Sequence, residues 1–328
     1  MPTKKRITVP GAIVHIMARG IDKRDIFVDD ADRSYFLKLF AGVLSKAAYH
    51  CYGWVLMNNH YHLIVRSSEQ PLNSLMRVLN SLYAKYFNAK YSRRGYLFQD
   101  RFKSILTQDQ KYLEELIRYV HLNPLRAGVC TSTRELDTYP WSGHAVLMGK
   151  AKNSFQTTDA VLRRFGKDKE TARKNYREFI KQGLNTIKEE WIVKAVRESN
   201  RGVEKKDIPG CWVIGEQEFV SSVIQRNKEK VYAGLILRQH WSLDTVAEKI
   251  CATYGIRREA LMNRNSQAVV SVCRKKFAHI CFRILGYSVA EIARYLNLSG
   301  PAVSWAAKHG AELVTKREKS LFMFFPPG

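Results

Sequence analysis

The chain is short of acidic residues. Its 328 residues include 30 Asp and Glu against 54 Lys and Arg, which gives a formal net charge of +24 at pH 7. An excess of this size predicts a polyanionic partner, and nucleic acid is the polyanion that best fits a basic protein. A basic surface that is merely solvated is the alternative, and it accounts poorly for so large an excess.

Long apolar runs and paired cysteines are also missing. No run of 18 or more apolar residues, secretory signal or lipidation motif occurs, so a membrane surface is a poor candidate partner and we expect a cytoplasmic protein. The six cysteines, at 51, 130, 211, 251, 273 and 281, form no Cys-x-x-Cys pair. This spacing indicates neither a zinc knuckle nor a disulfide framework, so we expect reduced thiols that pack in a core.

The most informative stretch is residues 54–66, a β-branched apolar run that predicts a buried strand. Side chains alternate across a strand, so His60 and His62 share one face, while Tyr61 and Leu63 share the other. Two neighbouring imidazoles can bind one cation. The alternative is a pair of partly buried, hydrogen-bonded histidines without a ligand.

A second informative stretch, residues 109–123, has its apolar residues at helical spacing, and Pro124 should end this helix near Asn123. Tyr119 and Asn123 are four residues apart, which places them on one face of the helix. A candidate nucleophile and a candidate oxygen ligand therefore point in the same direction.

The remaining pattern of the first half predicts an α+β fold. Strands are expected over 7–18, around 51–66 and over 102–107, and helices over 30–48 and 71–91. The short loop at 57–59 implies a hairpin, hence an antiparallel sheet with helices on one face. His15 lies on the first strand, and we interpret it as a satisfied histidine beside the core because no spacing ties it to His60 or His62.

The second half is expected to be all α. We predict a helical linker over residues 146–226, a DNA-binding domain over 227–318 and a tail over 319–328. Helices over 287–296 and 300–308, separated by 297–299, have helix-turn-helix spacing. We expect Ser299 and Ser304 to contact base edges, and Trp305 to be packed.

Basic residues in both halves are candidate phosphate contacts, because counterion release makes such contacts favourable. Those in the first half lie in the N-terminal tail, just after the second helix, and at the start of the strand expected over 102–107. Those in the second half precede the helix-turn-helix. The candidates are Lys4, Lys5, Arg6, Arg93, Arg94, Arg101, Lys103, Arg274, Lys275 and Lys276.

Five blocks in the first 145 residues, taken with the patterns above, resemble the IS200-like single-strand DNA transposases, and more closely the REP-associated tyrosine transposases. The sequence departs at Asn58, where such proteins often carry proline; this position is not a presumed ligand. The blocks are 18–20 with 26–30, 54–66, 95–103, 119–128 and 139–142. The resemblance implies a catalytic domain over 1–145 with the palm-like HUH endonuclease fold.

The same resemblance implies a chemistry. Tyr119 would attack a phosphodiester of single-stranded or hairpin DNA at repeats, leaving a 5′-phosphotyrosine and a free 3′-hydroxyl. His60, His62 and Asn123 would hold Mg²⁺ or Mn²⁺, and no nucleotide or other small-molecule cofactor is implied.

Residues 241–309 resemble the C-terminal DNA-binding domain of the bacterial replication initiator DnaA. They depart from it at 298–301, where Leu-Ser-Gly-Pro replaces the usual basic and histidine contacts. We therefore expect a different target site.

Two other functions are left open. One is a non-catalytic regulator, derived from a transposase, that binds a hairpin or operator. The other is a metal-dependent hydrolase of small molecules, which the high positive charge does not favour. The oligomeric state is open too, with a monomer favoured.

Overall fold

The computed structural model describes residues 9–185, 190–201, 203, 212–226, 241–263 and 267–315, together with 318 and 322. The chain divides into two compact units, Met1–Ile224 and Gln225–Gly328. We describe each unit by itself. Five of the six cysteines lie among the described residues, and these five are free, buried thiols, as expected. None of the described helices is long and apolar enough to cross a membrane.

The first unit is built on a five-stranded sheet of order β2-β3-β1-β4-β5. β2 (His50–Met57) and β3 (His60–Arg66) form the expected hairpin, and β1 (Ile13–Arg19) pairs antiparallel with both β3 and β4 (Lys103–Thr107). The short β5 (Trp212–Ile214) adds to β4 in parallel. The α+β class predicted from the sequence is confirmed, and its first four strands are antiparallel.

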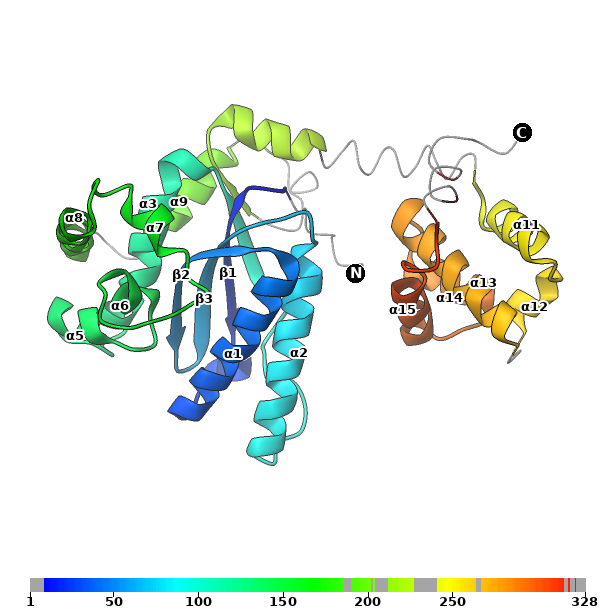
Figure 1. Cartoon of the computed structure of the whole chain (residues 1–328), viewed down its shortest axis with the longest axis horizontal. Coiled ribbons are helices and arrows are strands. Elements are labelled where there is room, and N and C mark those ends of the chain that lie inside the picture. The colour runs from blue at the N-terminus through cyan, green and yellow to red at the C-terminus, as the bar shows by residue number, and fades with distance from the viewer. Residues whose placement is uncertain are drawn as a thin grey trace. The chain divides into compact units, whose positions relative to one another are not determined.

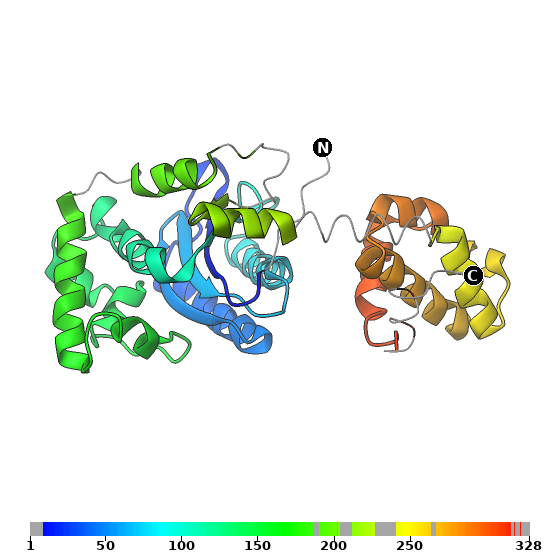
Figure 2. The same cartoon turned by 90° about the horizontal axis from the view of Figure 1, so that it is seen from above.

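Helices cover both faces of this sheet, not one (Figures 1 and 2). Tyr61, Leu63 and Val65 of β3 bury against α1 (Asp30–Ala47) and α2 (Leu72–Lys90). On the other face Ile64 buries with the apolar stripe of α3 (Asp109–His121). The expectation of helices on one face was wrong. The side chains on both faces of the central strands are apolar, so helices must cover each face.

A capping box fixes the start of α1. The Asp29 side chain accepts from the backbone N–H of Asp32 at 2.9 Å, and the Asp32 carboxylate accepts in return from the backbone N–H of Asp29. Lys90 at the end of α2 pairs with both carboxylates, at 2.7 and 2.8 Å. The start of α1 is therefore tied to the end of α2.

The segment predicted as a linker is part of the first unit, which is a correction of the domain boundary. It contributes the end of α6 (Gly143–Leu147), α7 (Thr158–Leu162), α8 (Lys169–Gln182), α9 (Glu190–Ser199), β5 and the helical residues 217–224. Gln156 accepts a hydrogen bond from the Trp54 indole at 2.9 Å, and Tyr176 lies in the core against α3. Smaller helices, α4 (Asn123–Arg126) and α5 (Thr133–Thr138), follow α3.

The second unit is helical, as predicted. It contains α11 (Leu243–Tyr254), α12 (Arg258–Met262), α13 (Ala268–His279) with a π-helical continuation over Ile280–Ile284, α14 (Val289–Leu296) and α15 (Gly300–His309). Asn297 ends α14 in the left-handed conformation, with φ of 51°, and Ser299 caps α15. The predicted pair of helices joined by a short turn is confirmed within a few residues of its expected bounds.

Candidate active site

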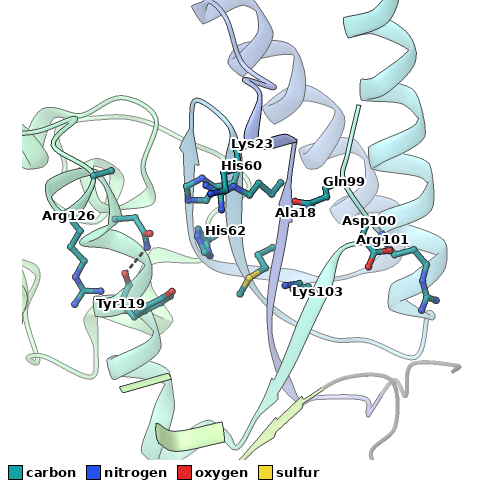
Figure 3. Close-up of a pocket in the computed structure, with 14 residues that line it drawn as sticks. Ala18, Lys23, His60, His62, Gln99, Asp100, Arg101, Lys103, Tyr119 and Arg126 are labelled. Carbon is teal, nitrogen blue, oxygen red and sulfur yellow. Dashed lines mark hydrogen bonds between the residues drawn. The ribbon is translucent and has the colours of Figure 1, made fainter. Parts of the chain in front are cut away.

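A cavity of about 970 Å³ opens on the face of the sheet that α3 covers (Figure 3). β1, β3, β4, α3 and α4 all contribute to its lining. The structure brings together the predicted nucleophile, the three predicted metal ligands and two of the predicted phosphate contacts: Tyr119, His60, His62, Asn123, Arg101 and Lys103. It adds residues that the sequence analysis did not assign to the site, among them Arg19, Lys23, Gln99, Asp100 and Arg126. Five cations and one carboxylate among these residues suit an anionic ligand.

The turn of the β2–β3 hairpin fixes the ring of His60. Its Nδ1 lies 2.6 Å from Oδ1 of Asn59, and the Asn59 amide nitrogen donates to the carbonyl of Lys23 at 2.9 Å. The second bond orients the amide, so Oδ1 faces the imidazole and can only accept. Nδ1 of His60 therefore carries the proton, and its Nε2 has a lone pair available for a ligand.

His62 is held by another histidine. It is 5% exposed, and its Nδ1 lies 2.8 Å from Nε2 of His15, which is fully buried. The two rings meet edge to edge and are nearly parallel, with centroids 5.1 Å apart and planes 15° apart. The interpretation of His15 as a histidine unconnected with the pair is wrong, because β1 and β3 pair with Met17 opposite His62 and His15 opposite Ile64. This register places His15 diagonally beside His62 on one face.

Burial keeps all three imidazoles neutral at pH 7. It lowers the pKa of His15 to about 3. Burial, with the nearby charge of Arg19, lowers the pKa of His60 to about 4. The pKa of His62 is well below its ordinary value, through burial first and then through His15 and His60. The neutral form is the one that can bind a metal ion.

Tyr119 lies across the cavity from β3, at the last turn of α3. Its ring meets His62 and His15 edge-on, with centroids 6.0 and 5.9 Å away. The guanidinium carbon of Arg126 lies 5.5 Å from the centre of the Tyr119 ring, and Figure 3 shows the two side chains together. This positive charge therefore lies beside the tyrosine and adds to the cations that line the cavity.

Asn123 closes the end of α3. Its amide nitrogen donates to the backbone carbonyls of Tyr119 at 2.9 Å and Val120 at 3.1 Å. These bonds occupy its donor side and leave Oδ1 as the atom that could bind a cation. Asn123 therefore supports the backbone of Tyr119 in addition to its predicted role as an oxygen ligand.

The donors fit a divalent cation. Two neutral imidazoles and one amide oxygen form a mixed nitrogen and oxygen set that suits Mn²⁺ and also Mg²⁺ with added waters. Among the described residues, no group of three or more His, Cys, Asp and Glu has a metal-binding arrangement. A third protein ligand would therefore be the neutral Asn123.

The other predicted DNA contacts of the first unit fall into three groups. Arg101 and Lys103 line the cavity. Arg93 and Arg94 follow the end of α2, where the Arg93 guanidinium lies over the Phe87 ring at 5.6 Å, and neither arginine lines the cavity. Lys4, Lys5 and Arg6 lie outside the described residues.

In the second unit, two of the three predicted phosphate contacts have internal partners. Arg274 donates to the backbone carbonyls of Leu261 at 2.7 Å and Ala260 at 2.9 Å. Lys276 is buried and pairs with Glu318 at 2.7 Å. Both side chains are thus engaged within this unit, which is a correction of their assignment to phosphate.

The remaining candidates lie together on two helices: Ser299, Ser304 and Trp305 belong to the cap and body of α15, and Lys275 belongs to α13. Trp305 is 54% exposed, so the expectation that it is packed was wrong. The ammonium of Lys275 lies 5.1 Å from the centre of its ring. Ser304 is exposed beside it, whereas the Ser299 hydroxyl accepts from the backbone N–H of Ala302 as a helix cap.

The buried histidines predict a loss of stability in acid. Burial lowers the folded-state pKa of His15 to about 3 and also depresses those of His62 and His121. In the unfolded chain these histidines have the ordinary pKa of 6.5 and bind protons below that pH, whereas in the folded protein they stay neutral. Their contribution to the free energy of unfolding is therefore present in full above pH 6.5 and is lost as the pH falls. We expect a loss of about 1.4 kcal/mol per pH unit for each such histidine. Urea unfolding of the first unit at about pH 7 and about pH 5 measures it, and His121→Gln should flatten the dependence. Equal stability at both pH values would contradict this prediction.

Comparison with known proteins agrees with the sequence motifs. Residues 8–123 match the family model described as "Transposase IS200 like". A solved structure of a REP-associated tyrosine transposase bound to a REP hairpin is similar at 15% identity, with a TM-score of 0.39, over 48% of this chain and 97% of that one. The search of curated proteins found no match. The family match includes His60, His62, Tyr119 and Asn123 and ends before the second unit, so the resemblance to DnaA stays a prediction.

Proposed function

We propose that the protein is a metal-dependent endonuclease and strand transferase of single-stranded DNA that acts at repeat-associated hairpins. The observation that carries this proposal is the position of Tyr119, edge-on to His62 at 6.0 Å inside a cavity lined by cations. A nucleophile, two imidazoles that can bind a cation, and positive charge are groups that can promote a phosphodiester transesterification. The match to IS200-like transposases over residues 8–123 supports it.

In the proposed reaction, Oη of Tyr119 attacks the phosphorus and forms a P–O bond. The bond from phosphorus to the 3′ oxygen breaks, the phenol proton is released, and the departing oxygen takes up a proton. The enzyme retains a 5′-phosphotyrosine, and the other strand end carries a free 3′-hydroxyl. A divalent cation bound by His60, His62 and Asn123 would polarise the phosphate and offset its developing charge. Because the covalent link conserves the energy of the phosphodiester, strand joining needs no nucleotide.

The basic lining provides the DNA site. Arg101 and Lys103 lie on the segment that leads into β4, and Figure 3 shows their side chains opposite Tyr119 and Arg126. Two basic borders on either side of the histidines suit a single strand that passes between them. Arg19 and Lys23 add positive charge near the hairpin turn that holds His60. The hairpin target is proposed by analogy with the similar transposase bound to a REP hairpin.

The alternative is a DNA-binding regulator without catalysis, which the basic charge alone would equally support. One assay separates the two. The protein is incubated with single-stranded DNA from flanking repeats and Mn²⁺, and the products are run on a denaturing gel. A protein–DNA adduct that survives denaturation supports the endonuclease, whereas binding without an adduct favours the regulator.

We expect Arg126→Gln to slow cleavage. The guanidinium lies 5.5 Å from the centre of the Tyr119 ring, where its charge would offset negative charge that develops as the tyrosine attacks the phosphate. The measurement is the single-turnover rate of adduct formation at saturating DNA. Arg163→Gln removes an exposed arginine on the same unit and should leave this rate unchanged. A wild-type rate at saturating DNA, with weaker DNA binding, would show that Arg126 only binds DNA.

We expect the second unit to bind DNA through the exposed face of α15. Lys275→Ala should reduce the slope of log affinity against log salt by about 0.9, the value for one phosphate contact on duplex DNA. Three contacts were predicted from the sequence, and the internal partners of Arg274 and Lys276 reduce this number to one. Lys249→Ala removes the same charge from an exposed position on α11 and is the matched control. Equal slopes for the three proteins would show that Lys275 does not contact phosphate.

A further inference from the structure

His15 lies directly behind His62 and has no part in the proposed chemistry. It is 0% exposed, its Nε2 lies 2.8 Å from Nδ1 of His62, and the planes of the two rings are only 15° apart. It reaches this place because β1 and β3 pair with Met17 opposite His62, so a residue two positions away lies on the same face. His15 touches one presumed ligand and the ring of Tyr119 but is not itself among the residues lining the cavity.

The other ring nitrogen of His15 argues against a purely structural role. Its Nδ1 is buried and has no hydrogen-bond partner among the described residues. Whichever nitrogen of His15 carries the proton, this Nδ1 is left as an unsatisfied donor or acceptor. An apolar residue of similar shape would avoid that cost, so the gain from His15 must lie in its bond to His62.

We propose that His15 is a positioning residue that sets the tautomer of His62. In this arrangement Nε2 of His15 accepts from the protonated Nδ1 of His62, and the lone pair of His62 Nε2 is presented to a divalent cation in the cavity. The opposite arrangement would place the His62 proton on Nε2 and block that ligand position. The inference rests on the proposed metal role of His62 and adds the residue that makes this role possible.

His60 provides an internal comparison. Its Nδ1 is bonded to Oδ1 of Asn59, an atom that can only accept, so its Nε2 is the free ligand nitrogen. Both members of the pair thus have a partner at Nδ1. The partner differs because His60 is half-buried beside a polar turn, whereas His62 is buried and has β1 as its neighbouring strand. Bonds of this kind to a ligand's second nitrogen orient the ring and raise metal affinity.

The first test reads the tautomer directly in the metal-free, full-length protein. Long-range ¹H–¹⁵N correlation spectra distinguish protonated from unprotonated ring nitrogens. We expect wild-type His62 to carry its proton on Nδ1. In His15→Phe, which preserves a flat ring but removes the acceptor, we expect the proton to move to Nε2. His15→Gln provides a carboxamide oxygen that can accept in place of Nε2, so it should retain the wild-type tautomer.

The second test measures Mn²⁺ affinity by electron paramagnetic resonance without DNA. His15→Phe should bind Mn²⁺ about 10- to 100-fold more weakly, the usual loss for a residue that orients a ligand, and His15→Gln should recover most of the affinity. His144→Gln changes another buried histidine of the unit, bonded to Asp137 and Tyr176 away from the cavity, and should leave the affinity unchanged. Thermal unfolding checks that each variant is folded.

The outcomes separate the inference from the function on which it rests. Wild-type His62 protonated on Nε2, or a folded His15→Phe with unchanged tautomer and Mn²⁺ affinity, would overturn the role of His15. If His15→Phe does not fold, the wild-type and His15→Gln spectra still decide. If the wild-type protein fails to bind Mn²⁺ at all, the proposed metal role falls, while the spectra still test the bond between the two histidines.

Discussion

Tyr119→Phe is expected to abolish the covalent adduct and to reduce cleavage of single-stranded DNA by a factor on the order of 10⁴ or more. The substitution removes only the hydroxyl that attacks phosphorus. The phenylalanine ring retains the edge-on contacts with His62 and His15 and the approach of Arg126, so neither the cavity nor the charge changes. DNA affinity should therefore remain close to that of the wild type. Single-turnover cleavage and a filter-binding titration on the same oligonucleotide measure the two quantities.

Tyr112 provides the matched control for this prediction. It is on the same helix seven residues earlier, which corresponds to a separation of ~10.5 Å along the axis. A tyrosine at that distance cannot reach the phosphorus that Tyr119 attacks, and Tyr112 does not line the cavity. Tyr112→Phe should cleave as the wild type does. An adduct that persists in Tyr119→Phe and disappears in Tyr112→Phe would move the nucleophile to the other residue.

The parts of this site that could be predicted from the sequence are those governed by local periodicity. Alternation along a strand placed His60 and His62 on one face, and helical spacing brought Tyr119 and Asn123 onto one side of α3. These relations depend only on the geometry of a single element. The structure bears them out, since His60, His62, Tyr119 and Asn123 line one cavity.

The residues that were missed depend on relations between elements. His15 reaches His62 only through the register of β1 against β3, and register is not contained in the sequence of either strand alone. Arg126 reaches Tyr119 because α4 follows α3 after a single residue, Leu122. A basic residue near a candidate nucleophile in sequence was the one signal that could have indicated Arg126. No such signal existed for His15.

The assignment of charged residues was the least reliable step. A cluster of three consecutive cations, 274–276, predicted a phosphate site, yet on a helix three consecutive side chains point in different directions. Arg274 and Lys276 face α12 and Glu318, and the Lys275 ammonium lies near Trp305. The prediction of a linker over 146–226 was also wrong. Its apolar residues are few and widely spaced in the sequence, yet they pack together with α3 in the core of the first unit.

His62→Ala and His60→Ala are each expected to reduce metal-dependent cleavage at least about 100-fold, because each removes a presumed imidazole ligand. Asn123→Ala should lose less as a ligand, since water can replace a neutral oxygen, although it also frees the carbonyl of Tyr119. Folding should survive these changes. His62→Ala leaves Nε2 of His15 buried without its partner, at a cost of about 1–3 kcal/mol.

The metal dependence of these variants separates a ligand from a structural histidine. Adding EDTA to the wild-type protein should stop cleavage, and Mn²⁺ should restore it. His60→Ala and His62→Ala should each require a much higher Mn²⁺ concentration for the same rate, whereas His144→Gln, a change in another buried histidine, should follow the wild-type curve. The measurement is single-turnover cleavage across a Mn²⁺ series at a pH near 7, where all three cavity-side imidazoles are neutral. If EDTA left cleavage intact, His60 and His62 would bind no catalytic cation, and their neutral, hydrogen-bonded rings would then act only as the wall against which Tyr119 packs.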